Sequence, residues 1–241
     1  MDTQHAAPFP QLRTAYLRAI AEVWRKPTYL ATLAAEASKP RGVLPLLEAD
    51  KDWPFKFPFD VKFVISGGQT RPQWAPVGTS GWFGFGDEFV IYLPEKPDAQ
   101  EADVLARYCT EFPSLLGTAT VPNVEPPPDF AEFGVVTSRI LALAWADTGF
   151  RSQLYAATDA RTLVQGAMDY LVPWNFTLQF KEYKSPGGRT SAHLLSTAYW
   201  KQEFPYSQIT VFCPQSPPVG VEAIALAAYN DTGGQYPFTC A

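Results

Sequence analysis

The sequence predicts an α+β fold made of two tandem copies of one unit, packed together as a pseudo-dimer. Three observations predict it: a long internal repeat, apolar residues at helical spacing early in each copy, and alternating apolar residues at strand spacing later in each copy. Each copy is therefore expected to form helices followed by a small antiparallel sheet.

The internal repeat is long and its register is nearly constant. At an offset of 121 residues the second half repeats the aromatic and apolar residues of the first, so that Trp24 falls on Trp145, Tyr29 on Phe150, Leu33 on Leu154, Trp53 on Trp174, Phe55 on Phe176 and Phe59 on Phe180. Further along, the offset becomes 120, and residues 89–94 fall on 209–214. A period of this length indicates a duplicated domain, because solenoid repeats run from about 20 to 50 residues.

Helices are expected at the start of each copy. Apolar residues follow a helical period over residues 14–37 with a break near Pro27, which predicts two short helices. At the corresponding break in the second copy, Asp147 and Thr148 can cap the following helix with their side-chain oxygens, and Thr28 is expected to do the same in the first copy. A third helical piece is expected at 40–49 and at 159–170.

The period changes to that of strands after these helices. Alternating apolar residues predict a strand at 55–63 in the first copy and at 176–180 in the second. A further strand is expected at 88–93 and at 208–213, each followed by a proline that stops ladder pairing. Terminal helices are expected at 101–107 and 221–229.

A proline-rich segment separates the copies. Residues 121–129 contain Glu125 followed by three prolines, which is typical of an extended, semi-rigid linker. The predicted domains are a first repeat at 1–120, the linker at 121–129, and a second repeat with a C-terminal tail at 130–241. Each copy has more aromatic residues than a lone domain of its size can bury, so the copies are expected to pack on each other. Assembly of the whole chain into a homo-oligomer is left open.

Charge and hydropathy argue against two classes of partner. The net charge is -5, the pI is near 5.1 and the basic residues are scattered, so nucleic-acid binding is not expected. The sequence lacks a run of about 18 apolar residues and a secretory signal, which predicts a cytoplasmic protein without a membrane span. The three cysteines, Cys109, Cys213 and Cys240, are widely spaced and predict reduced thiols.

The residue types that catalysis needs are scarce. His5 and His193 are the only histidines, neither has a counterpart in the other copy, and a structural role is predicted for His193. The glycine-dense run 78–86 lacks the lysine and the following helix of a phosphate-binding loop; it predicts a tight hairpin with Trp82 and Phe85 packed inward. The sequence therefore predicts no catalytic residue, no metal ligands, no cofactor and no enzymatic activity.

Four repeated tryptophans admit two interpretations, a ligand cage or a packed core. Their strict repetition favours the core, because each would anchor a helix to the sheet of its own copy. The four are Trp24, Trp53, Trp145 and Trp174.

Two runs of the sequence resemble a known family. Residues 144–154 form an apolar helix end with Trp145, then Asp147, Phe150 and Leu154, and residues 90–97 form a strand that runs into a Leu-Pro-Glu-Lys-Pro turn. These runs resemble the alpha subunit of nitrile hydratase and the leader peptides derived from it. Such leaders carry ribosomally made precursors of modified peptides. The resemblance touches most of both repeats, although the first copy has a lysine where the family has its acid.

The resemblance implies a nitrile-hydratase-alpha-like fold for each repeat, but not nitrile hydration. That enzyme holds iron or cobalt in a Cys-x-x-Cys-Ser-Cys run, and neither copy contains such a cluster.

What remains is the leader function of thiazole/oxazole-modified microcin (TOMM) bacteriocin precursors. In these precursors a cyclodehydratase recognises a folded leader and converts Cys, Ser and Thr of a C-terminal core to azoles. The resemblance implies cleavage at Gly233 and Gly234 by a peptidase or exporter, and it implies Thr239 and Cys240 as the modified residues of an exported product. The two glycines can equally mark the end of a helix. The competing hypothesis is a catalytically inactive nitrile-hydratase-like domain pair that serves as a scaffold or binds a small molecule between the halves. A third hypothesis is an enzyme with unrecognised chemistry.

Overall fold

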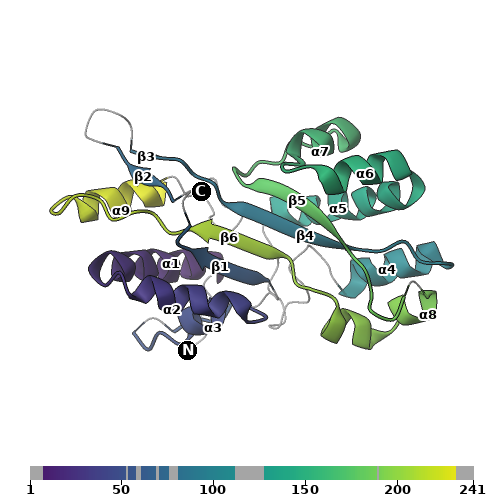
Figure 1. Ribbon diagram of the computed structural model, residues 1–241, viewed down its shortest axis with the longest axis horizontal. Coiled ribbons are helices and arrows are strands. Elements are labelled where there is room, and N and C mark those ends of the chain that lie inside the picture. The colour runs from purple at the N-terminus through teal and green to yellow at the C-terminus, as the bar shows by residue number, and fades with distance from the viewer. Residues whose placement is uncertain are drawn as a thin grey trace, which may run out of the picture.

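The computed structural model describes residues 8–231, except 53, 58–60, 69–70, 76–80, 112–127 and 189. A central sheet carries a group of helices at each end (Figure 1). α1, α2 and α3 lie at one end with α9, and α5, α6 and α7 lie at the other end with α4 and α8.

The opening helices of the two repeats correspond one to one. The first repeat forms α1 (Pro8–Arg25), α2 (Tyr29–Ala35), the 3-10 turn η1 (Glu36–Ser38) and α3 (Leu44–Glu48). The second repeat forms α5 (Pro128–Ala146), α6 (Thr148–Ala156) and α7 (Arg161–Met168). The predicted break near Pro27 is confirmed, because α1 ends just before this proline.

The two predicted helix caps turn out differently. The Asp147 carboxylate accepts hydrogen bonds from the backbone N–H groups of Gly149 and Phe150, at 2.7 and 3.0 Å, and caps α6 as expected. Thr28 precedes α2 but its side chain makes no capping hydrogen bond, so that prediction is wrong. Its backbone is already helical, whereas a capping residue needs extended backbone like that of Asp147.

One four-stranded sheet joins the two repeats. The first repeat supplies β1 (Lys62–Ser66) and β4 (Glu88–Pro94), and the second supplies β5 (Thr177–Tyr183) and β6 (Gln208–Phe212). The strand order is β1-β6-β4-β5, with β1 parallel to β6, β4 parallel to β5, and β4 antiparallel to β6. Among the described residues, every pairing in this sheet therefore joins one repeat to the other.

A pseudo-two-fold axis passes between the two central strands. Phe89 on β4 lies opposite Ile209 on β6, and these two residues are each other's counterparts at the offset of 120. In an antiparallel pair, a residue faces its own equivalent only where a two-fold axis crosses the ladder. The duplicated chain thus folds like a dimer whose subunits have exchanged strands.

The helices and tryptophans follow the same exchange. The terminal helix of the first repeat, α4 (Glu101–Glu111), packs on α5 of the second, and that of the second repeat, α9 (Glu222–Asp231), packs on α1 of the first. Trp24 Nε1 donates to the Pro214 carbonyl at 3.0 Å, and Trp145 Nε1 donates to the Pro94 carbonyl at 3.2 Å. These two bonds are equivalent under the pseudo-symmetry, and each crosses between the repeats.

The expected separate antiparallel sheet in each repeat is therefore wrong. The positions of β4 and β6 agree with the predicted strands, and α4 and α9 agree with the predicted terminal helices. What differs is the choice of partner strand. Strand exchange lets each repeat cover aromatic surface that it cannot bury alone.

The register of the outer strands also differs from the expectation. Lys62 pairs opposite Gln208 and Thr177 pairs opposite Glu88, so Lys62 and Thr177 are equivalent at an offset of 115 and not 121. Phe55 and Phe57 are buried as expected but precede β1 and belong to no strand.

An ion pair bonds the backbone of Phe57, which belongs to no described strand. Arg41 Nη2 lies 3.0 Å from Glu48 Oε1 and donates to the Phe57 carbonyl at 2.9 Å, while the Phe57 N–H donates to Glu48 at 2.8 Å. The backbone of Phe57 is thus satisfied by two side chains in place of a ladder.

The remaining described elements lie at the sides of the sheet. β2 (Gln73–Trp74) and β3 (Trp82–Phe83) form an antiparallel pair, which agrees with the predicted hairpin, although residues 76–80 of its turn lie outside the described residues. Trp82 is buried and Phe85 packs against the core. The second repeat has a short helix α8 (Ser191–Leu194) and a π-helical turn η3 (Tyr199–Glu203) in this part of the chain.

Three of the four repeated tryptophans belong to the core. Trp145 and Trp174 are buried, Trp24 is partly buried against the core, and Trp53 lies outside the described residues. The proposed domain boundaries at 120 and 130 stay a prediction, because most of the linker at 121–129 lies outside the described residues and α5 begins within it, at Pro128.

Candidate functional site

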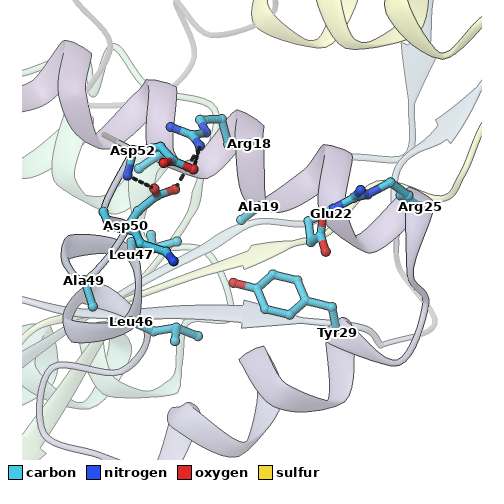
Figure 2. Close-up of a pocket in the computed structure, with 12 residues that line it drawn as sticks. Arg18, Ala19, Glu22, Arg25, Tyr29, Leu46, Leu47, Ala49, Asp50 and Asp52 are labelled. Carbon is cyan, nitrogen blue, oxygen red and sulfur yellow. Dashed lines mark hydrogen bonds and ion pairs between the residues drawn. The ribbon is translucent and has the colours of Figure 1, made fainter. Parts of the chain in front are cut away.

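A groove with charged and apolar walls lies among α1, α2 and α3 (Figure 2). Its cavity volume is about 460 Å³, which is within the range of ligand-binding sites. Ala15, Ala19, Leu46, Leu47 and Ala49 provide its apolar lining, and Arg18, Glu22, Arg25, Tyr29, Asp50, Lys51 and Asp52 provide its polar lining.

Ion pairs neutralise most of the charges of this groove. Arg18 Nη2 lies 3.2 Å from Asp50 and 3.8 Å from Asp52, which ties α1 to the segment after α3. Glu22 pairs with Arg25 and with Lys26, whose Nζ lies 3.1 Å from the carboxylate. The hydrogen bonds from Arg25 and Lys26 hold the pKa of Glu22 below its usual value.

Tyr29 places a hydroxyl inside the groove. Burial raises the pKa of Tyr29, and the negative charges of Glu22 and Asp50 raise it further. The phenol is therefore protonated at neutral pH and can donate a hydrogen bond to a bound group. The groove offers one neutral donor, an apolar surface and paired charges, which suits a neutral or zwitterionic ligand.

The second repeat does not repeat the polar lining of the groove. At the offset of 121, Arg18 corresponds to Arg139, but Glu22 corresponds to Leu143, Arg25 to Ala146 and Tyr29 to Phe150. These polar side chains are thus specific to the first repeat and are not needed for the shared fold. The groove was not predicted from the sequence, although these unequal pairs within well-matched helices were a signal for it.

A second feature of functional interest is the way the chain leaves the folded body. α9 runs antiparallel to α1: the hydroxyls of Tyr16 and Tyr229 are 3.0 Å apart, and Arg13 donates to the carbonyl of Asn230. At the other end of α9, Ala223 lies beside Trp24 in a shared groove. α9 therefore ends next to the beginning of α1.

Comparison with known protein families shows to which family this two-repeat chain belongs. A sequence model described as ribosomal natural product, two-chain TOMM family matches residues 8–116 and matches again at 128–237. The chain belongs to this family. Each of the two matches corresponds to one structural repeat, with the boundary falling between α4 and α5. The search of curated proteins and the search of solved structures found no match.

The resemblance to the nitrile hydratase alpha subunit stays a prediction. No group of three or more His, Cys, Asp or Glu that could hold a metal ion is found among the described residues. Among the helices that the structure describes, none is long and apolar enough to cross a membrane.

The residues expected to be cleaved or modified in this TOMM-family chain all follow α9. Gly233, Gly234, Thr239 and Cys240 lie outside the described residues, so the structure does not bring them together with other groups. The family match ends at residue 237, before Thr239 and Cys240.

The two cysteines of the folded body are free thiols with different surroundings. Cys213 is buried at the end of β6, and burial raises its pKa to about 11 despite the nearby Arg71. Cys109 is exposed on α4, with its Sγ 3.2 Å from Ser138 Oγ on α5. Cys213 is thus the less reactive of the two.

His193 has the structural position that the sequence predicts. Its Nε2 lies 3.1 Å from Glu203, and its ring packs edge-on against Tyr199 with centroids 5.3 Å apart. The backbone N–H of His193 donates a hydrogen bond to the side chain of Thr190, which is the N-cap of α8. His193 therefore ties α8 to η3.

Proposed function

We propose that this chain is a ribosomally synthesised TOMM precursor. Its folded two-repeat body is the leader that modifying enzymes recognise, and the tail after Gly234 is the part that they modify. The observation that carries this proposal is the family match over both repeats. A cyclodehydratase-type enzyme is the principal partner, and a peptidase or exporter that acts at Gly233 and Gly234 is the second.

The proposed chemistry is cyclodehydration of the tail. The thiol of Cys240 adds to the carbonyl carbon of Thr239, and loss of that oxygen as one water gives a thiazoline ring. The hydroxyl of Thr239 adds in the same way to the carbonyl of Phe238 and gives a methyloxazoline. Each ring removes one water from the mass of the chain.

The folded body favours modification of the tail over its own cysteines. Cyclisation of Cys109 would turn its backbone nitrogen into a ring nitrogen without a hydrogen, and the N–H of this residue in α4 could no longer donate within the helix. Cyclisation of Cys213 would require an enzyme to reach a buried thiol at the end of β6.

The test is co-expression of the full chain with the cyclodehydratase of its own gene cluster, followed by mass spectrometry of the intact chain and of its peptides. We expect loss of one or two waters, confined to residues 235–241. A variant with both Thr239→Ala and Cys240→Ala should lose none, whereas the matched control Cys109→Ala should lose as much as the parent. An unmodified tail on a protein that accumulates intact would contradict the proposal.

A second candidate function is small-molecule binding by a scaffold without catalysis. The groove of Figure 2 favours it, because its polar lining is not repeated in the second copy and it has the volume of a ligand site. A ligand found by screening for a rise in melting temperature should lose this effect in Tyr29→Phe. Its effect should persist in Phe150→Tyr, the reverse change at the equivalent position of the second repeat.

A further inference from the structure

The exposed face of α9 is apolar. Ala223, Ile224 and Ala227 are exposed, and Ile224 keeps 65% of its surface in solvent. The turn before α9 adds Val219, which is 97% exposed. Ile224 and Val219 are two of the five large apolar side chains that are exposed among the described residues. Large apolar side chains gathered in one region mark interaction surfaces more often than single ones do.

The duplication supplies an internal control for this face, because α4 is the counterpart of α9. The buried residues correspond at the offset of 121, with Val104 matching Ala225 and Tyr108 matching Tyr229. On the outer side, Ala102 and Ala106 of α4 correspond to Ala223 and Ala227 of α9, so Ile224 is the exposed residue of the three that differs, and its counterpart is Asp103. The fold itself tolerates charge at this position. The apolar side chain of Ile224 is therefore not required for packing within the body.

A groove borders the apolar face. It lies between α9 and α1, with a cavity volume of about 380 Å³, and Trp24, Ala223 and Leu226 line it. Arg25 and Glu222 add one charge of each sign to its lining. A partner could thus bury an apolar side chain beside Trp24 while its polar groups contact Arg25 and Glu222. Protein interfaces commonly combine an apolar core with a polar rim in this way.

The chain that follows α9 indicates what the face is for. Thr239 lies eight residues after Asp231, a span that reaches at most about 30 Å even when extended. We propose that the face formed by Val219, Ala223, Ile224 and Ala227, with the groove beside Trp24, is the surface on which the cyclodehydratase-type enzyme docks through an apolar patch of its own. This inference rests on the proposed precursor function.

Docking at this place delivers the tail to the enzyme. A short tether between a docked surface and the reacting residues gives an effective concentration in the millimolar range, without any contact to the tail itself. The corresponding face of α4 lies at the opposite end of the molecule (Figure 1). An enzyme bound there could not use the tail in this way.

The experiment measures binding of the full chain to the cyclodehydratase of its own gene cluster, together with the water lost per chain when both are incubated. Ile224→Asp installs the residue type that α4 carries at the equivalent position. Ala227→Asp has a matched control in Ala106→Asp, the same change at the equivalent exposed position of α4. We expect each α9 variant to weaken binding by at least about tenfold and to slow water loss. Ala106→Asp should match the parent in both, and all variants should melt as the parent does.

The outcomes separate this inference from the function on which it rests. If the parent neither binds the enzyme nor loses water, the precursor function itself fails. If the parent is modified and both α9 variants bind and react like the parent, the docking surface is wrong while the precursor function stands. The docking proposal is also overturned if the α9 variants convert a parent dimer to a monomer with unchanged enzyme binding, because the face then joins two copies of this chain.

Discussion

Truncation of Trp145 tests both the core and the exchanged architecture. Trp145 is 4% exposed, and its indole N–H bonds to the carbonyl of Pro94 at the end of β4, which comes from the other repeat. Replacing a buried Trp by Ala removes packing that is worth about 3–5 kcal/mol. For a chain of this size, each kcal/mol lowers the melting temperature by about 2–4 °C. We therefore expect Trp145→Ala to melt about 6–20 °C below the parent.

A matched variant separates packing from the hydrogen bond. Trp145→Phe keeps most of the apolar volume but loses the hydrogen bond to the Pro94 carbonyl. Loss of this bond should lower the free energy of unfolding by about 1 kcal/mol, in addition to the effect of poorer packing. Trp24→Ala, at the equivalent and partly buried position of the first repeat, should cost less than Trp145→Ala.

The assay is thermal unfolding followed by circular dichroism and by calorimetry. Because the strands are exchanged, each variant should lower one shared transition of the whole body and should not split it in two. A melting temperature of Trp145→Ala within a degree or two of the parent would refute the core assignment. Two separate transitions, of which only one shifts, would refute the strand exchange.

Two further predictions concern the linker and the thiols. The first replaces residues 121–127 by a protease site and cuts the chain there. The two fragments should co-elute in size-exclusion chromatography, because β1 pairs with β6 and β4 with β5 across the repeats. Fragments that separate without denaturant would contradict this pairing. In a Cys240→Ser background, alkylation near pH 8 should label Cys109 at least about a hundredfold faster than Cys213, since burial shields Cys213 and raises its pKa to about 11, leaving little thiolate. Peptide mapping over time measures both rates, and equal labelling in the folded chain would show that β6 does not bury this thiol.

The local elements of this protein can be read from its sequence. Apolar runs that end at Pro94 and Pro214 place β4 and β6, the stretches after these prolines place α4 and α9, and the glycine-dense run 78–86 contains β3 of the β2–β3 hairpin. Periodicity is a property of neighbouring residues, so it survives in a single sequence. The duplication and the family can be recognised from the sequence for the same reason, because both depend on the order of residues along the chain.

The candidate site was only partly within reach of the sequence. Thr239 and Cys240 stay a prediction, because both lie outside the described residues. The groove of Figure 2 combines residues from three helices, and the importance of Ile224 depends on which face of α9 packs against α1. Both need the packing to be known before the residues can be grouped.

The choice of strand partners was decided only by the tertiary structure. A strand that alternates apolar and polar residues has the same pattern whether it pairs within its repeat or with the other one, in parallel or antiparallel. The register of β1 likewise depends on the Arg41–Glu48 pair, which satisfies the backbone of Phe57 and removes an aromatic segment from the sheet. By itself the sequence determined that there are two copies of one unit. The need of each copy to bury its aromatic surface against the other made them a single exchanged fold.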